Sequence, residues 1–191
     1  MDALARLLAR DEIRQLAHRY AVAMDARDLD ALVALFVPDV RVGREGVGRE
    51  ALRLDFDRQL RAIGVSILFV GNHVIDFDAA DRARGVVYTI AQIQDGERWI
   101  RQAIRYDDSY ALRDGRWLFV RRRHLLWYGV EEPRNPLLQA PAEWPKSHTG
   151  RGTLPESLET WQRFWRGAGA DASASGDAPA APRRDSPGAG S

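Results

Sequence analysis

Three side chains in the first half of the chain have the chemistry to remove a proton from carbon: Tyr20, Asp25 and His73. A histidine is the usual general base near neutral pH, and a neighbouring carboxylate holds its tautomer and stabilises the imidazolium. A phenol can polarise a carbonyl or protonate a leaving oxygen. We therefore predict that His73 is the base, that Asp25 is its partner and that Tyr20 assists.

Each of these side chains also has a purely structural interpretation. Asp25 can lie in solvent at a helix end, and Tyr20 can be a packing residue with one hydrogen bond. His73 can be a core histidine bonded to a backbone carbonyl. The catalytic interpretation requires Asp25 and His73 to lie within hydrogen-bond reach. If they do not, a binding or scaffold module is favoured.

The carboxylate ends an amphipathic helix that is predicted from Asp11 to Asp25. Apolar residues recur at the three-and-four spacing of a buried helical face, and Tyr20 lies on that face. On an ideal helix, Tyr20 and Asp25 project about 140° apart. Both can line one cavity only if the cavity meets the helix end or the last turn is distorted.

His73 lies in a predicted strand over residues 65–77. Strict alternation places it on one face with Ile67, Phe69 and Ile75. That apolar face suits a base in a pocket, which would meet the carboxylate of the helix end.

Further candidate ligand-binding residues lie in the later strands. Alternation places Arg121 on the face of Trp117, where it could anchor an anion or a carbonyl, although triple arginine is more often a solvated face. The segment 105–108 is interpreted as a cross-strand charge network. We predict that the substrate contacts Arg121, Phe69, Asn72, Trp99, His124 and Trp127.

The order of the elements predicts an α+β fold. A short lead-in helix over residues 1–9 precedes the main helix, and Asp28 is the predicted cap of a third helix that Pro38 stops. A weak strand over 40–47 and a helix over 50–63 follow. The remaining pattern is an antiparallel meander with strands at 65–77, 84–94, 99–112 and 117–128.

The C-terminal third shows neither the helical nor the strand periodicity of apolar residues. Residues 129–166 are predicted to form a proline-rich wrap and a last helix, opened by a capping box at 153–156 and carrying Trp161 and Trp165 on one face. That helix should pack on the domain or on a neighbouring subunit. Residues 167–191 contain only small, polar and charged types and are predicted to be disordered.

Composition narrows the function classes. The chain has 191 residues, with 28 basic and 27 acidic side chains, so no global field favours nucleic acid or an anionic membrane. It has no cysteine, no glycine-rich phosphate loop and no histidine pair at metal spacing. We therefore expect neither a metal nor another cofactor. The absence of an uninterrupted apolar run favours a cytoplasmic location.

Several segments resemble the SnoaL-like proteins of the nuclear-transport-factor-2-like superfamily. They are the residues 11–20 with Asp25, the segments 28–32 and 35–40, Gly71-Asn-His-Val, Arg105-Tyr-Asp-Asp and Asp114-Gly-Arg-Trp-Leu-Phe-Val-Arg. The resemblance covers about residues 5–128. It implies a cone-shaped α+β barrel whose N-terminal helices pack on a curved mixed or antiparallel sheet.

Within that superfamily, Tyr20, Asp25 and His73 resemble the site of the bile-acid 7α-dehydratases, and the chain is also similar to hexachlorocyclohexane dehydrochlorinases and, more distantly, scytalone dehydratases. The resemblance implies a cofactor-independent lyase for a small, apolar, cyclic or aromatic substrate, with Arg121 at the position of a pocket arginine. It also implies a homo-oligomer, a dimer or trimer. Leu68 and Phe69 depart from relatives that carry a polar residue there. An isomerase, a cyclase or a carbon–carbon lyase with the same base, or a non-catalytic module, remain alternatives.

Overall fold

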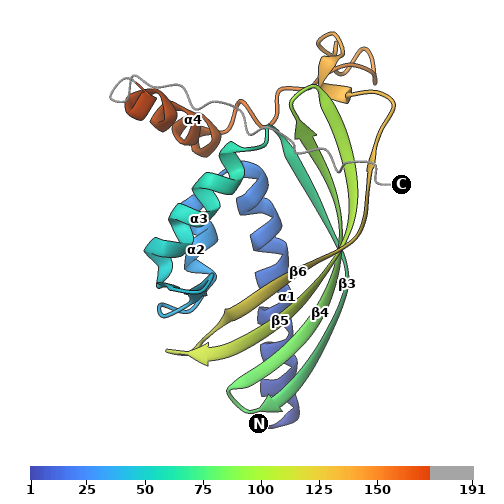
Figure 1. Ribbon diagram of the computed structural model, residues 1–191. Helices are drawn as coiled ribbons and strands as arrows, with labels where there is room; N and C mark the ends of the chain where they lie inside the picture. The colour runs from blue at the N-terminus through green and yellow to red at the C-terminus, as the bar shows by residue number, and fades with distance from the viewer. Residues whose placement is uncertain (173–191) are drawn as a thin grey trace, which may run out of the picture.

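The computed structural model describes residues 1–172, with side chains through Gly167. In chain order the elements are α1 (Ala3–Ala26), α2 (Leu29–Ala34), β1 (Arg41–Val42), β2 (Gly46–Val47), α3 (Arg49–Arg61), β3 (Ser66–Ala79), β4 (Arg82–Asp95), β5 (Arg98–Arg113), β6 (Arg116–Glu131), the 3-10 helix η1 (Pro136–Leu138) and α4 (Glu159–Ala172). Figure 1 shows helices gathered on the concave side of one long, curved sheet. This arrangement confirms the predicted α+β class.

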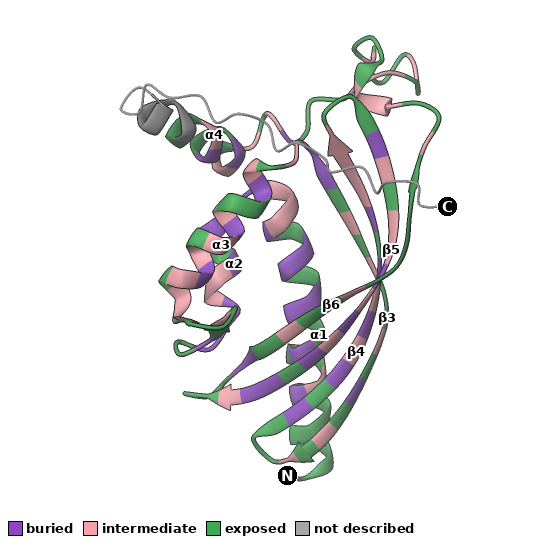
Figure 2. Cartoon of the chain, in the orientation of Figure 1, coloured by how far each residue is buried: buried purple, intermediate pink, exposed green. Residues whose placement is uncertain are grey.

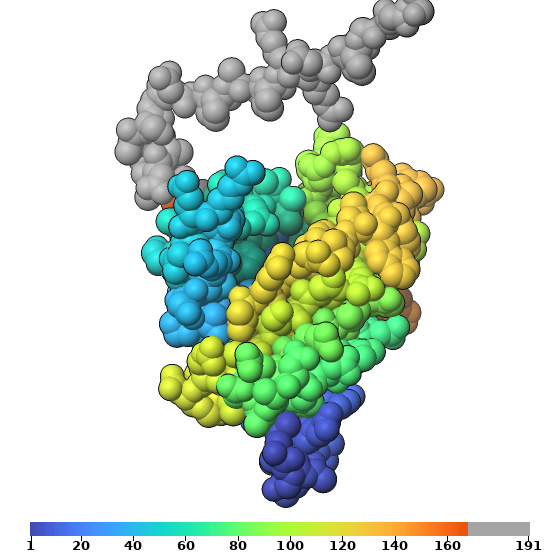
Figure 3. All heavy atoms as spheres, turned by 60° about the horizontal axis from the view of Figure 1, so that its bottom comes forward, coloured from blue at the N-terminus to red at the C-terminus, as the bar shows by residue number. Residues whose placement is uncertain are grey.

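The first helix is continuous, which corrects the prediction of two helices broken near Asp11. The Asp2 side chain caps it by accepting a hydrogen bond from the Ala5 amide. It ends where Arg27 adopts a left-handed conformation with φ of 56°. The first turns extend beyond the sheet (Figure 3), which leaves Leu4, Leu7 and Leu8 exposed.

The next segment returns the chain to the sheet. Asp28 caps α2 through the Ala31 amide, as predicted. The backbone after α2 then pairs with β6, because Leu35 and Val37 exchange hydrogen bonds of 2.9 Å with Phe119. The weak strand predicted over 40–47 is the small hairpin of β1 and β2, and α3 follows it.

The sheet is fully antiparallel, in the order β3-β4-β5-β6. The β5–β6 turn has positive φ at Asp114 (51°) and Gly115 (74°), the conformation of a tight type I′ hairpin. The sheet curves around α1 but does not close, so the predicted barrel is an open cone.

The core lies between the concave face and the helices (Figure 2). Its centre is a group of aromatic rings in edge contact, with Tyr20 6.4 Å from Phe36, 6.1 Å from Phe56 and 6.2 Å from Phe119. This cluster joins all three N-terminal helices to β6.

The C-terminal helix folds back onto its own domain at the end of α1 (Figure 1). Trp161 and Phe164 are buried, and Thr160 donates a hydrogen bond of 2.8 Å to the Ala26 carbonyl. The predicted capping box at 153–156 is wrong, because that segment is a turn and the helix begins at Glu159. Helix α4 continues to Ala172, whereas the disordered tail was predicted to begin at residue 167. Residues 173–191 of that tail lie outside the described residues.

Candidate functional site

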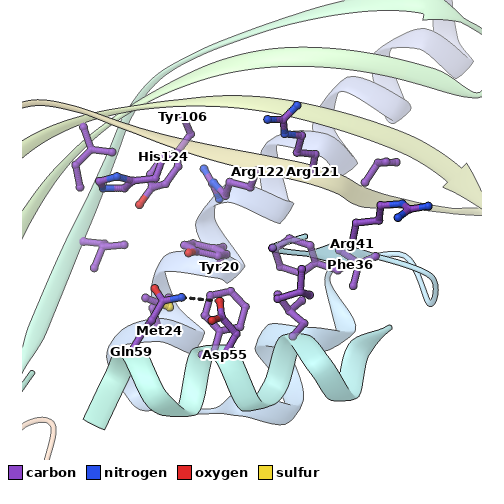
Figure 4. A pocket seen from close by; sticks show the side chains of 18 of the residues that line it. Tyr20, Met24, Phe36, Arg41, Asp55, Gln59, Tyr106, Arg121, Arg122 and His124 are labelled. Carbon is purple, nitrogen blue, oxygen red and sulfur yellow. Dashed lines mark hydrogen bonds between the residues drawn. The ribbon is translucent and has the colours of Figure 1, made fainter. Parts of the chain in front are cut away.

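A cavity of about 1060 Å³ lies between the concave face of the sheet, α1, α3 and the segment that follows α2. Its walls are mostly apolar. Polar and charged side chains also line it, and Figure 4 shows part of them: Tyr20, Asp39, Arg41, Asp55, Gln59, Ser66, Gln102, Tyr106, Arg113, Arg121, Arg122 and His124. A cavity that combines apolar walls with polar groups able to orient a ligand is typical of a small-molecule site.

Arg122 is the most deeply placed charge of this cavity. Its side chain is only 4% exposed, and its guanidinium lies 4.4 Å from the centre of the Tyr20 ring and 4.0 Å from that of Tyr106. Figure 4 shows it directed toward Tyr20. On its other side, Nε lies 3.4 Å from Oδ1 of Asp108, which is fully buried. The carboxylate and the two rings together fix this guanidinium in position.

The Arg122 guanidinium is not saturated. The ion pair with Asp108 does not have hydrogen-bond geometry, and neither Nε nor Nη1 of Arg122 has a hydrogen-bond partner among the described residues. Buried polar groups in proteins are normally hydrogen-bonded, so such an exception calls for an explanation. Arg122 lines the cavity, so its guanidinium is a candidate to bind an oxygen of a ligand.

A β-bulge explains why the cavity anchor is Arg122 and not the predicted Arg121. In the register of β5 and β6, Tyr110 pairs with Phe119 but Ser109 pairs with Arg121, so Val120 is an extra residue. One extra residue inverts the alternation that follows it. Arg122 therefore shares the concave face with Phe119, while Arg121 borders the cavity with its side chain directed away from Tyr20 (Figure 4).

Asp25 is held by β3. Its carboxylate accepts hydrogen bonds from the Ser66 hydroxyl at 3.2 Å and from the Leu68 amide at 3.0 Å. Burial raises its pKa to about 6, against the lowering effect of the Leu68 and Ser66 hydrogen bonds and the Arg27 charge. The side chain beside it on the concave face is that of Leu68, which is apolar. Asp25 is not among the residues that line the cavity, although Tyr20 is.

Arg27 closes the helix end. It donates hydrogen bonds to the carbonyls of Met24 and Gly64 and to the Ser66 hydroxyl, and its guanidinium lies 4.8 Å from the Trp161 ring. Burial lowers its pKa to about 10, and the Asp25 charge partly offsets this. Arg27 thus joins α1, β3 and α4.

His73 does not bond Asp25, which corrects the predicted pair. Its Nε2 lies 3.0 Å from the Tyr110 hydroxyl, and its Nδ1 is buried without a partner among the described residues. A second bulge sets its place, because Val70 pairs with Thr89 and His73 with Val87. Burial, then the positive charge of Arg122, lowers the pKa of His73 to about 4. His73 does not line the cavity.

Tyr110 joins His73 to the Arg122 ion pair. Its hydroxyl donates a hydrogen bond of 2.9 Å to Oδ2 of Asp108. Burial raises the pKa of Asp108 to about 6, while Arg122 and this hydrogen bond lower it. Burial also raises the pKa of Tyr110 above its usual range, so the phenol is protonated.

Two phenols and one imidazole face the cavity with Arg122. Burial raises the pKa of Tyr20 and of Tyr106, so both are donors at neutral pH. Neither hydroxyl has a hydrogen bond to another described residue. His124 packs edge-on against Tyr106 at 5.4 Å, and burial lowers its pKa, so its imidazole is neutral at pH 7. Of the described residues that line the cavity, it is the only histidine.

Four predicted contact residues do not line the cavity. Phe69 is 60% exposed and Asn72 lies in the β3 bulge, because that bulge turns Leu68 and Val70 inward instead. Trp99 is buried beside Val65 and Trp161 in a separate cluster. Trp127 is 61% exposed, because β6 bulges there a second time, and it packs on Tyr88.

The residues missed by sequence analysis are Tyr106, Asp108, Tyr110 and Arg122. Three of these residues could have been found from the sequence of β5, where strict alternation places Tyr106, Asp108 and Tyr110 on one face. The opposite face holds the predicted charge network, in which Asp107 accepts hydrogen bonds from Arg105 at 2.7 Å and from Arg123 at 2.5 Å.

Other classes of site find little support in residues 1–172. No cluster of three or more histidine, aspartate or glutamate side chains is placed there to hold a metal ion. None of the helices in that range combines the length and apolar character needed to cross a bilayer.

Comparison with known proteins places this site in a family. Residues 5–123 match the model of the SnoaL-like domain. The crystal structure of LinA is 26% identical, with a TM-score of 0.62 over 70% of this chain and 95% of that one. The hexachlorocyclohexane dehydrochlorinase LinA-type3 from Novosphingobium barchaimii is 24% identical, with a TM-score of 0.61 over 69% and 95%. A putative scytalone dehydratase from Novosphingobium aromaticivorans is 21% identical, with a TM-score of 0.60 over 73% and 100%. No curated protein matches. The chain therefore belongs to the SnoaL-like domain family, within the NTF2-like fold.

Proposed function

We propose that this protein is a lyase that catalyses an elimination on a small, largely apolar molecule, with Arg122 as the anchor for its oxygen. The observation that carries the proposal is the guanidinium of Arg122, a residue that lines the cavity and whose Nη1 has no hydrogen-bond partner among the described residues. The likeness to LinA, a dehydrochlorinase, supports the reaction class. The apolar walls favour a cyclic or aromatic substrate body.

His124 is the proposed base, in place of the predicted Asp25 and His73 pair. Its imidazole is neutral at pH 7 and can accept a proton. It lies two residues from Arg122 on the same face of β6, a separation of about 7 Å along a strand. A substrate carbonyl bound to Arg122 could therefore present its neighbouring carbon to His124.

The elimination then proceeds by proton transfer and loss of a leaving group. His124 takes the proton from the carbon beside the carbonyl, and the electron pair moves to the oxygen, where Arg122 stabilises the charge. The pair returns to form the carbon–carbon double bond as the leaving group departs. The imidazolium gives its proton to that group, and Tyr20 donates a hydrogen bond to it.

The test is a screen of elimination substrates that carry a carbonyl, such as aromatic β-hydroxy ketones and β-chloro ketones, with the absorbance of the unsaturated product as readout. We expect Arg122→Lys to lower kcat/KM about 10²-fold to 10³-fold, because lysine lacks the planar fork and the stacking. His124→Gln should lower kcat about 10²-fold to 10⁴-fold. Full activity of either variant would contradict the proposal. Tyr128→Phe, outside the cavity, is the control.

A non-catalytic binding module is the second candidate. It is favoured by the absence of a hydrogen bond between Asp25 and His73 and by the apolar Leu68 beside Asp25. Binding of screened compounds that depends on Arg122, without turnover of any, would support this function. Product analysis of an active protein would separate a lyase from an isomerase or a cyclase.

A further inference from the structure

A line of four polar side chains runs from the α1 side of the sheet to the cavity. His73 Nε2 lies 3.0 Å from the Tyr110 hydroxyl, that hydroxyl lies 2.9 Å from Asp108 Oδ2, and Asp108 Oδ1 lies 3.4 Å from Arg122 Nε. We propose that His73, Tyr110 and Asp108 form a polarised hydrogen-bond chain that orients the Arg122 guanidinium, so that His73 is a positioning residue. The inference rests on the proposed function only for the role of Arg122.

The chemistry of the groups fixes the direction of every hydrogen bond in the chain. An ionised carboxylate only accepts, so the Tyr110 hydroxyl must donate to Asp108. Its oxygen is then the acceptor for His73, which must carry its proton on Nε2. Nδ1 is left without a proton, in agreement with its lack of any acceptor.

The surroundings keep His73 neutral. Burial opposes its protonation most, and the positive charges of Arg122 of β6 and Arg14 of α1 add to this effect, with His18 of α1 on the same side as Arg14. Tyr110 is its hydrogen-bond partner on the sheet. A neutral His73 keeps one tautomer, and the direction of the chain stays fixed.

Gly85 provides the space for this chain. Tyr110 pairs with Ala83, and its side chain reaches across β4 to His73 on β3. A Cβ at Gly85 would lie 3.0 Å from Cε2 and 3.1 Å from the hydroxyl of Tyr110. The ring therefore occupies the room that a side chain at Gly85 would take.

Asp108 transmits the orientation to Arg122. One carboxylate oxygen is occupied by Tyr110, so the other is directed at Nε of Arg122. This places the guanidinium against the rings of Tyr20 and Tyr106, and Nη1 has no hydrogen-bond partner among the described residues. Without Tyr110 the carboxylate could rotate, and the guanidinium would lose its defined direction.

The first test compares the tautomer of His73 in the wild type and in Asp108→Asn. The tautomer is measured by ¹⁵N NMR of the imidazole at pH 7. Arg122 only donates, so the amide oxygen should face Arg122 and the amide nitrogen should face Tyr110. The Tyr110 hydroxyl must then donate to His73. We expect Nε2–H in the wild type and Nδ1–H in the variant.

An unchanged Nε2–H tautomer in Asp108→Asn would overturn the proposed chain. Should that variant fail to fold, Tyr110→Phe serves instead. It removes the acceptor for Nε2–H, so both tautomers should be populated. A single Nε2–H tautomer in Tyr110→Phe would contradict the inference in the same way.

The second test is the affinity for benzoate, an aromatic carboxylate, measured by calorimetry. We expect Tyr110→Phe to weaken binding about tenfold, on the order of one hydrogen bond to a charged group. His73→Ala should weaken it about threefold, and His73→Gln should restore it, because its amide also donates to Tyr110. Tyr128→Phe should bind as the wild type does.

The two proposals fail in different ways. If Arg122→Lys leaves the benzoate affinity unchanged, Arg122 is not the anchor and the proposed function is wrong. The NMR result would still decide whether His73, Tyr110 and Asp108 form the proposed hydrogen-bond chain. A loss of affinity in Arg122→Lys together with unchanged affinity in both Tyr110→Phe and His73→Ala would overturn the positioning role alone.

Discussion

Two arginines are buried to nearly the same degree, and they differ in how their nitrogens are paired. Arg27 is 2% exposed; its two terminal nitrogens donate to two carbonyls and one hydroxyl, and only its Nε has no partner among the described residues. The side chain of Arg122 is 4% exposed; its Nε lies in an ion pair with Asp108, and neither Nε nor Nη1 donates a hydrogen bond to a described residue. Arg27 joins α1, β3 and α4, whereas Arg122 faces a cavity.

The comparison shows that burial alone does not identify a functional charge. A buried charge that donates several hydrogen bonds to different elements of the protein stabilises the fold, and its removal leaves other buried groups unpaired. A buried charge with unmet hydrogen bonds at a cavity is available to a ligand. The same contrast separates Asp25, held by Ser66 and Leu68, from Asp108, which acts on Arg122.

The largest expected effect concerns Arg27. Arg27→Met should lower the free energy of unfolding by about 3–5 kcal/mol, because it leaves the Gly64 carbonyl and the Ser66 hydroxyl without their donor and removes the positive charge that acts on Asp25. Arg122→Lys keeps a cation beside Asp108 and should cost less than about 1 kcal/mol. Urea denaturation measures both. If both variants lose the same free energy of unfolding, the proposed difference between the two arginines is wrong.

The pH dependence of stability sharpens the view of Asp108. Burial raises its pKa from 3.8 to about 6 in the folded protein, so the folded state binds the proton more tightly. Its ionisation therefore costs stability as the pH rises through this window, and the full cost is present above about pH 6. The free energy of unfolding of Asp108→Asn, taken relative to that of the wild type, should therefore rise by on the order of 1–3 kcal/mol between pH 4 and pH 7.

Denaturation curves at several pH values provide the measurement for Asp108→Asn. Leu54→Gln, on the exposed side of α3, is a non-titrating control whose curve should run parallel to that of the wild type. A parallel curve for Asp108→Asn as well would mean that Asp108 is not the buried acid described here.

Gly85→Ala tests whether the route to Arg122 is tightly packed. The added Cβ would lie 2.9 Å from the Val74 carbonyl oxygen and 3.0 Å from Tyr110. We expect a loss of about 1–3 kcal/mol, the usual cost of overpacking. Gly129→Ala is the matched control, because its Cβ would find no atom closer than 3.6 Å. If thermal unfolding shows the same stability for both variants, the packing argument is wrong.

The smallest effect concerns the contact of α4 with the Arg27 corner. Thr160→Val removes the hydrogen bond to the Ala26 carbonyl and should cost about 0.5–1.5 kcal/mol. Thr153→Val, in the exposed turn before α4, should cost less. Benzoate binding should stay unchanged in both variants, since this corner stabilises the fold and is remote from Arg122. A change in binding would link the two regions.

Part of the site could be predicted from the sequence. Tyr20 was predicted from its place on the apolar face of a helix, and it lines the cavity, as does His124. For Asp25, the sequence left open a solvated helix end and a carboxylate held by a partner, and the structure shows a half-buried carboxylate that is hydrogen-bonded. Its partners are a hydroxyl and a backbone amide, and a backbone amide carries no signal in the sequence.

The sequence by itself determined the α+β class, the helices α2 and α3, the four strands and their antiparallel order, because hydrophobic periodicity and turn residues are local properties. Only the tertiary structure decided which faces the polar side chains occupy. The bulges at Gly71–Asn72 and at Val120 invert the alternation along β3 and β6, which turns Leu68 and Arg122 inward and Phe69 outward. A bulge depends on how neighbouring strands pair and curve, so the residue that reaches the cavity is set by contacts between strands.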